Sequence, residues 1–160
     1  MNSTETVEKL VYDGRIPEYK VLFVCTGNTC RSPMAEAIYN SIARKAELNT
    51  VAYSAGVCAN GANISQHAKN VLVENLLVSE DFSRKSVQIN REMCKDADLI
   101  VGMTEAHAMK LVMSFPEFAT KIKALDTEIS DPFGGYIETY RECFLEIKHA
   151  VESEFFSEIL

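Results

Sequence analysis

Along the chain, short runs of apolar residues alternate with longer stretches in which apolar residues return every three or four positions. The short runs are rich in β-branched and aromatic residues, as buried strands are, and the longer stretches have the spacing of helices that bury one face. The predicted strands are 21–24, 50–54, 98–103 and 121–125. The predicted helices are 33–45, 65–75, 104–113 and 136–156, and residues 79–97 are expected to be irregular to helical. This alternation predicts a single-domain α/β fold with a four-stranded parallel sheet flanked by helices.

The stretch from residue 21 to residue 33 joins the first predicted strand to the first predicted helix. Ser32 is a preferred helix N-cap and Pro33 suits a first helical turn, so the connecting loop is short. Cys25 opens this loop and Arg31 ends it. A strand–loop–helix junction directs backbone N–H groups and the positive end of the helix dipole at one point. We expect a cradle for a phosphate-like anion with a nucleophile at its floor.

The residue types in this loop suit nucleophilic attack on phosphorus. Helix N-termini and nearby cations favour the thiolate form of a cysteine, and both conditions are met at Cys25. The guanidinium of Arg31 matches two oxygens of a phosphoryl group, and Gly27 lets the backbone approach the anion closely. The Ser32 hydroxyl can donate to the sulfur of Cys25. Taken singly, Cys25 also fits a small buried apolar residue and Ser32 a helix cap, but their context favours a functional loop.

A second candidate group lies near the end of the chain, in the sequence Asp131-Pro132. Proline fixes the backbone after the aspartate, so a loop rather than a strand presents the carboxyl group. Ligands of doubly wound sheets bind at the carboxyl ends of the strands. The Cys25 loop and the Asp131 loop are therefore expected at the same edge, where a protonated Asp131 can serve as a general acid. On its own, Asp-Pro is also common in turns that approach a helix.

These motifs resemble the low-molecular-weight protein tyrosine phosphatase family. The resemblance rests on residues 24–36 (Val-Cys-Thr-Gly-Asn-Thr-Cys-Arg-Ser-Pro-Met-Ala-Glu), 54–56 (Ser-Ala-Gly) and 131–135 (Asp-Pro-Phe-Gly-Gly), and it covers about residues 19–158. It implies a flavodoxin-like, phosphotyrosine phosphatase I fold and a phosphocysteine intermediate, without metal or cofactor. The implied catalytic residues are Cys25 as nucleophile, Arg31 as phosphate ligand and Asp131 as general acid. The implied phosphate-binding residues are Thr26, Gly27, Asn28, Thr29, Cys30 and Arg31, supported by Ser32 and Ser54.

Substrate choice depends on three residues expected to form the wall of the pocket, Thr29, Cys58 and Phe133. Tyrosine-directed members resemble Cys-x-Gly-Asn-Ile-Cys-Arg-Ser and carry two aromatic residues after Asp-Pro. Here Thr29 stands in the isoleucine position and Phe133 alone follows Asp-Pro, which resembles the protein arginine phosphatase branch. In that branch Asp131 would also pair with the guanidinium of the substrate. Cys58 argues against this branch, because arginine-directed members can have an aromatic wall at that position. We expect phosphoarginine on a protein as the substrate, with phosphotyrosine as the alternative.

Some members of the family place a histidine shortly before the third strand to brace the loop asparagine. The nearest position here is Phe82, so we expect Asn28 to rest on Ser54 or on water. The three histidines are expected to face solvent and to bind no metal. They are His67, His107 and His149.

The cysteines suggest redox control rather than structural disulfides. Their odd number, five, has neither a disulfide nor a zinc pattern. Cys25 and Cys30 share one loop, and family members can form a reversible disulfide between such residues, which would switch the enzyme off. Arsenate reduction on the same fold requires a resolving pair near residues 80–95, where only Cys94 occurs, so it is a remote alternative. A further alternative is a phosphate-binding module without catalytic activity. The presence of Cys25, Arg31 and Asp131 together disfavours it.

Length and charge set the remaining expectations. The 160 residues suit one domain, predicted over 18–160, preceded by an extension over 1–17 that the family resemblance does not explain. The net charge of −7 argues against nucleic acid or an anionic membrane as a partner, and no run of about 18 apolar residues occurs. We expect a cytoplasmic protein that acts on phosphorylated proteins as a monomer or weak dimer.

Overall fold

The computed structural model describes residues 17–77 and 83–160. Residues 1–16 of the predicted extension, and Phe82, lie outside the described residues. The strands are β1 (Tyr19–Cys25), β2 (Thr50–Gly56), β3 (Leu99–Gly102) and β4 (Ile122–Ala124). The helices are α2 (Arg31–Lys45), α3 (Gln66–Glu74), α4 (Arg91–Asp96), α5 (Glu105–Ser114) and α6 (Ile137–Phe155), with a 3₁₀ helix over Pro116–Lys121. Each predicted strand and helix is present within a few residues of its expected bounds.

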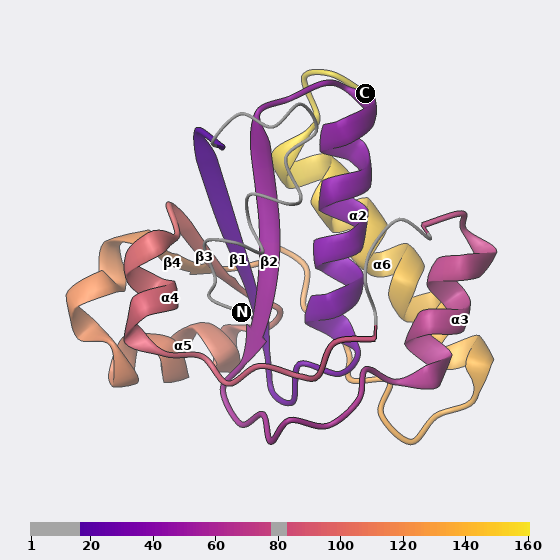
Figure 1. Ribbon diagram of the computed structural model, residues 1–160, viewed down its shortest axis with the longest axis horizontal. Helices are drawn as coiled ribbons and strands as arrows, with labels where there is room; N and C mark the ends of the chain where they lie inside the picture. The colour runs from indigo at the N-terminus through magenta and orange to yellow at the C-terminus, as the bar shows by residue number, and fades with distance from the viewer. Residues whose placement is uncertain (1–16, 78–82) are drawn as a thin grey trace.

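The strands form a parallel sheet in the order β2-β1-β3-β4, which confirms the predicted fold class. Figure 1 shows α2, α3 and α6 on one face of the sheet and α4 and α5 on the other. At the carboxyl edge, Cys25 lies opposite Gly56 of β2, and Val24 lies opposite Gly102 of β3. The register therefore places the end of β1 between two glycines, in the middle of the edge where ligands of such sheets bind.

Helices on both faces explain why β1 reads as a continuous apolar run. Val21 and Phe23 belong to the larger buried cluster, shared with α2 and α6, and Leu22 and Val24 belong to the cluster under α4 and α5. All four side chains are fully buried. Successive side chains of a strand point to opposite faces, so only a strand covered on both sides needs apolar residues at every position.

The first helix begins earlier than the sequence predicts. Its N-cap is Cys30 rather than Ser32, and no side chain caps it. Ser32 is fully buried inside the first turn, with its hydroxyl beside the sulfur of Cys25. A serine before a proline usually caps a helix, but here the hydroxyl is engaged by neighbours across the loop, which local sequence preference does not reveal.

The outer strand β2 is tied to α2 by the buried side chain of Asn40. Its amide nitrogen donates to the carbonyl oxygen of Ala52 at 2.8 Å, and its amide oxygen accepts from the N–H of Ala52, also at 2.8 Å. The side chain of Asn40 thus makes with Ala52 the two hydrogen bonds that a neighbouring strand would make at this edge of the sheet. Both backbone groups of Ala52 are satisfied although β2 has a neighbour on one side only.

One of the three histidines contradicts the expectation of solvent exposure. His67 and His149 are exposed as predicted, but His107 in α5 is only 6% exposed. Its ring nitrogens lie 3.0 Å from the hydroxyls of Thr26 and Thr104. His107 is buried because α5 packs closely on β3. A Cβ atom at Gly102 of β3 would lie only 3.0 Å from the Cβ atom of His107. Burial, with Arg31 nearby, lowers the pKa of His107 to about 4.

Replacing Asn40 with alanine is expected to lower the free energy of unfolding by about 2–4 kcal/mol, because two buried backbone groups lose their partners. Urea denaturation followed by circular dichroism measures the change. Asn70→Ala, at an exposed position in α3, is the matched control and should stay within about 0.5 kcal/mol of the wild type. Equal stability of the two variants would contradict the role given to Asn40.

The depressed pKa of His107 predicts a loss of stability in mild acid. Between its ordinary value of 6.5 and about 4, the unfolded chain binds a proton that the folded chain does not, so stability falls as pH drops through this window. The loss amounts to at most about 3 kcal/mol. In His107→Gln the difference in unfolding free energy between pH 7 and pH 4.5 should shrink, whereas His149→Gln should keep the wild-type difference. An unchanged slope in His107→Gln would refute this.

Candidate active site

The loop between β1 and α2 closes tightly against the end of β2. The backbone passes so near that a Cβ at Gly56 would lie 2.5 Å from the carbonyl oxygen of Thr26 and 2.9 Å from the nitrogen of Asn28. Asn28 has a φ of 56°, in the left-handed region that asparagine enters more readily than other residues with a side chain. Such a conformation costs about 1 kcal/mol and persists only where surrounding contacts hold it. The loop is therefore a constrained segment, as an anion cradle requires.

Cys25 lies at the floor of this loop, only 3% exposed. Its sulfur is 2.9 Å from the hydroxyl oxygen of Ser32. That oxygen accepts a hydrogen bond from the side-chain nitrogen of Asn28 at 2.9 Å, and the hydroxyl can donate to the carbonyl oxygen of Ala55 at 3.3 Å. The sulfur of Cys25 lies nearer to the hydroxyl than this carbonyl does, so the single Ser32 proton can turn from Ala55 to the sulfur and stabilise negative charge there.

Arg31 and Asp131 meet across the same site. A guanidinium nitrogen of the buried Arg31 donates to the carbonyl oxygen of Ile129 at 3.1 Å, and the other terminal nitrogen is 3.6 Å from a carboxylate oxygen of Asp131. The second oxygen of Asp131 accepts from the backbone nitrogen of Phe133 at 3.1 Å. The Asp131 side chain is 54% exposed. The expectation that the two loops reach one edge is therefore confirmed.

These groups surround a pocket of about 430 Å³. All three residues expected in its wall line it, and Phe133 is 78% exposed. Asn28, which was also expected to bind phosphate, is fully buried and does not line the pocket, and its side chain is engaged by hydrogen bonds within the protein. Asn60 and Ala62 also line the pocket, and the sequence offered no signal for them beyond their place in a surface loop. The full lining is Cys25, Thr26, Gly27, Thr29, Cys30, Arg31, Cys58, Asn60, Ala62, Asp131 and Phe133.

The side chain of the loop asparagine, Asn28, is held by Ser54, which the sequence led us to expect, and by two further groups that the sequence did not reveal. The amide nitrogen of Asn28 donates to the hydroxyl of Ser54 at 3.0 Å, as predicted. Its amide oxygen accepts from the backbone nitrogen of Val87 at 2.9 Å and from the guanidinium of Arg84 at 3.2 Å. Arg84 lies two positions after Phe82, in a segment without helix or strand. No spacing or pattern in the sequence there predicts that its side chain contacts the loop.

The remaining cysteines occupy different settings. All five are free thiols. Cys30 is buried in the loop, with its sulfur 3.5 Å from the hydroxyl of Tyr140. Cys94 is fully buried in α4 on the opposite face of the sheet, where burial raises its pKa to about 11. Cys143, on α6, has its pKa raised to about 12 by burial. Neither of the last two has the character of a reactive thiol.

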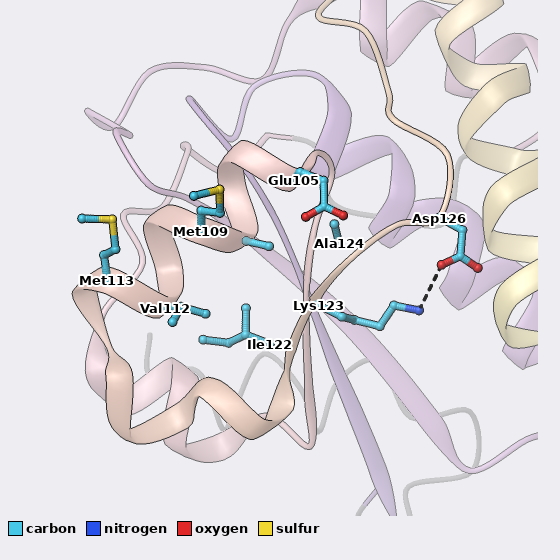
Figure 2. Close-up of a pocket in the computed structure, with 9 residues that line it drawn as sticks. Glu105, Met109, Val112, Met113, Ile122, Lys123, Ala124 and Asp126 are labelled. Atoms are coloured by element: carbon cyan, nitrogen blue, oxygen red, sulfur yellow. Dashed lines mark ion pairs between the residues drawn. The ribbon is translucent and has the colours of Figure 1, made fainter.

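Within residues 17–77 and 83–160, no group of three or more metal-ligating side chains occurs, and no helix is long and apolar enough to cross a membrane. A second pocket, of about 530 Å³, lies between α5 and β4 (Figure 2). Val112 of α5 lies beside Ile122 of β4 there, and Met109 and Met113 of α5 also line this pocket. It shares no lining residue with the pocket around Cys25, and no cysteine lines it.

Comparisons with known proteins agree with this geometry. Residues 20–159 match the family of low molecular weight phosphotyrosine protein phosphatases. A protein-arginine-phosphatase of Geobacillus stearothermophilus is 38% identical over 142 residues, which cover 84% of this chain and 92% of that protein. A crystal structure of a low molecular weight protein tyrosine phosphatase from T. tengcongensis is 34% identical, with a TM-score of 0.80, over 89% of this chain and 100% of its own.

A further solved structure is a cysteine-to-serine mutant of the YwlE arginine phosphatase with a phosphorylated active-site serine. It is 31% identical, with a TM-score of 0.77, over 86% of this chain and 98% of its own. Relatives named for arginine and for tyrosine are thus similar to this chain to nearly the same degree. The match over residues 20–159 shows that the chain belongs to the low molecular weight phosphotyrosine protein phosphatase family and is a phosphatase.

Proposed function

We propose that the protein hydrolyses phosphorylated side chains of proteins in two steps, with Cys25 as nucleophile. In the first step the Cys25 thiolate attacks phosphorus, and a sulfur–phosphorus bond forms as the bond to the leaving atom breaks. The electron pair of that bond stays on the leaving nitrogen or oxygen, which takes a proton from Asp131. The short contact of Cys25 with Ser32, opposite the Arg31–Asp131 pair in one pocket, is the observation that carries this proposal.

In the second step, Asp131 is a carboxylate and accepts a proton from water. The water oxygen attacks phosphorus, the sulfur–phosphorus bond breaks, and its electron pair returns to Cys25. The hydroxyl of Ser32, 2.9 Å from the sulfur, stabilises the departing thiolate. The net reaction consumes one water and releases inorganic phosphate and the free side chain. The phosphorylated serine in the YwlE mutant supports a covalent intermediate at the equivalent position of that relative.

Charge on the transferring phosphoryl group is met by fixed donors. Arg31 is held by the carbonyl of Ile129, so its guanidinium is oriented before substrate arrives. The backbone N–H groups of the loop and the N-terminus of α2 add partial positive charge at the same point. A protein with a net charge of −7 can therefore still attract a phosphoryl dianion locally.

Phosphoarginine is the substrate that the pocket favours. A carboxylate oxygen of Asp131 already lies 3.6 Å from the guanidinium of Arg31, so its exposed side can accept a second guanidinium from a substrate. Thr29 places a hydroxyl at the wall, and Asn60 adds an amide, where a phenol ring would prefer apolar contact. Phe133 is a single aromatic side chain and does not form a two-sided slot for a ring. Cys58, which also lines the pocket, counts against phosphoarginine, because arginine-directed members can have an aromatic wall at that position.

Two alternatives have different support. Hydrolysis of phosphotyrosine is supported by the similarity to tyrosine phosphatases, at nearly the identity found for arginine phosphatases. Arsenate reduction has no support from Cys94, since its buried position leaves it unable to reach the pocket around Cys25. A reversible disulfide between Cys25 and Cys30, which are both free thiols here, forms only when an oxidant such as a peroxide removes two electrons, so it would regulate the enzyme rather than replace its function.

Cys25→Ser is expected to lower turnover of an aryl phosphate by at least about 10³-fold, because the hydroxyl is a much weaker nucleophile at neutral pH. Inorganic phosphate should still bind, which isothermal titration calorimetry measures. Cys94→Ala, distant from the pocket, should stay near the wild-type rate. Activity retained in Cys25→Ser, or dependent on an added divalent metal, would refute the nucleophile assigned here.

Thr29→Ile is expected to shift the ratio of kcat/KM for phosphoarginine peptide over phosphotyrosine peptide toward phosphotyrosine by about tenfold, because it replaces a hydroxyl with apolar surface. Both peptides are assayed side by side by phosphate release, in the wild type as well. Thr120→Ile, at an exposed position outside the pocket, is the control. A wild type that turns over only phosphotyrosine would exclude the preference proposed, and an unchanged ratio in the variant would exclude Thr29 as a reason for it.

A further inference from the structure

The imidazole of His107 in α5 lies beside the phosphate loop, where the two-step reaction described above gives it no part. It is buried and does not line the pocket around Cys25. One ring nitrogen, Nε2, lies 3.0 Å from the hydroxyl oxygen of Thr26, and the other, Nδ1, lies 3.0 Å from that of Thr104. Thr26 is exposed and does line the pocket. The hydroxyl of Thr26 therefore connects the buried imidazole with the place where an anion would bind.

The far end of this connection is fixed by the start of α5. Thr104 is the N-cap of that helix, and its hydroxyl oxygen accepts from the backbone nitrogen of His107 at 3.3 Å. A hydroxyl has one proton to donate, and Nδ1 of His107 can accept it when that nitrogen carries no proton of its own. In this arrangement the Thr104 hydroxyl both accepts and donates, and the proton of the neutral imidazole is on Nε2.

The position of the imidazole proton decides what Thr26 offers to the pocket. With the proton on Nε2, His107 donates to the oxygen of Thr26, and the Thr26 proton is left for an acceptor in the pocket. With the proton on Nδ1, Thr26 donates to Nε2 instead, and its proton is turned away from the pocket. The oxygens of a phosphoryl dianion are acceptors, and hydrogen bonds to an ionised acceptor are the stronger ones. A bound phosphoryl group therefore favours the proton on Nε2.

His107 makes this contribution without a charge. Burial, and next Arg31, lower its pKa to about 4, and Lys110 acts in the same sense. The carboxylates of Asp131 and Glu128 act in the opposite sense but do not offset the burial. The ring is therefore neutral near pH 7, so it supplies a directed hydrogen bond, while Arg31 supplies positive charge at the pocket.

We propose that His107 is a positioning residue of this phosphatase, which makes the hydroxyl of Thr26 a donor to the phosphoryl group. This donor is additional to Arg31 and to the backbone N–H groups of the loop. The proposal rests on the proposed function, because it takes the pocket around Cys25 to be the place where the phosphoryl group binds. His107 does not touch the substrate and acts only through Thr26.

The test is a double-mutant cycle on the Kd of inorganic phosphate, measured by isothermal titration calorimetry at pH 7. Thr26→Val keeps the shape of the side chain, removes its hydroxyl and is expected to weaken phosphate binding about tenfold. His107→Leu should weaken it about three- to tenfold, because nothing then directs the Thr26 proton to the pocket. The double variant should bind phosphate no more weakly than Thr26→Val, since His107 acts through Thr26.

His107→Gln is the conservative variant that separates this role from packing. Its amide nitrogen can take the place of Nε2 and donate to Thr26, so phosphate affinity should stay within about twofold of the wild type. His149→Leu is the matched control for His107→Leu, since His149 is exposed on α6, and it should also stay within twofold. A side chain that only fills space would give the same loss in His107→Gln as in His107→Leu.

Nitrogen-15 NMR of the His107 imidazole in the wild type shows directly which ring nitrogen carries the proton, and it serves where a variant does not fold. In the phosphate complex the proton is expected on Nε2. A proton on Nδ1 in that complex would overturn the proposal. So would wild-type phosphate affinity in His107→Leu or in Thr26→Val, additive losses in the double variant, or failure of His107→Gln to restore binding.

The proposed function fails separately. If Cys25→Ser remains active, the chemistry assigned to Cys25 is wrong, whereas the phosphate affinities still decide the role of His107. An inactive Cys25→Ser beside unchanged phosphate affinity in His107→Leu removes only the role of His107.

Discussion

The buried amide of Asn28 is the point on which the catalytic loop depends. Four hydrogen bonds converge on one side chain, from the first turn of α2, from β2 and from the segment that precedes α4. Together they hold a backbone conformation that is unfavourable for a residue with a side chain. The loop amides can face an anion only while this arrangement persists. A strained loop at a binding site is maintained by contacts away from the ligand, and here those contacts are visible individually.

The sheet supplies the second requirement, which is that distant parts of the chain meet at one place. Parallel strands place their carboxyl ends at the same edge, so the loops that follow β1 and β4 approach each other. A guanidinium nitrogen of Arg31 then lies 3.6 Å from a carboxylate oxygen of Asp131. The same guanidinium is oriented by its hydrogen bond to the carbonyl oxygen of Ile129. The glycines opposite the end of β1 allow the close approach, since a Cβ at Gly56 would collide with the loop backbone. The parallel topology thus brings the two loops to one edge, and the glycines there leave room for the loop backbone.

Charge in this region is arranged locally rather than by the net charge of the protein. Arg31 faces the pocket and is paired in part with Asp131, whereas Arg84 lies behind the loop and is paired with Glu36. Two cations therefore flank the loop from opposite sides, each with one carboxylate. His107, beside Thr26, adds no charge at neutral pH because burial lowers its pKa to about 4. The positive potential at the site comes from guanidinium groups and backbone dipoles.

The local sequence determined the strands, the helices and the chemistry of the loop, because each is written in neighbouring residues. Apolar runs and helical spacing predicted the α/β sheet, and Cys25, Gly27, Arg31 and Ser32 predicted a cysteine-based phosphate site within one short segment. The expectation of a parallel sheet also allowed Asp131 to be placed at the same edge as Cys25. Tertiary structure alone decided the rest. Ser32 became a partner of Cys25 instead of a helix cap, His107 became buried, and Arg84 came to brace Asn28 from 56 residues away. Such contacts join segments whose meeting depends on how helices pack on the sheet, and no pattern among adjacent residues contains that information.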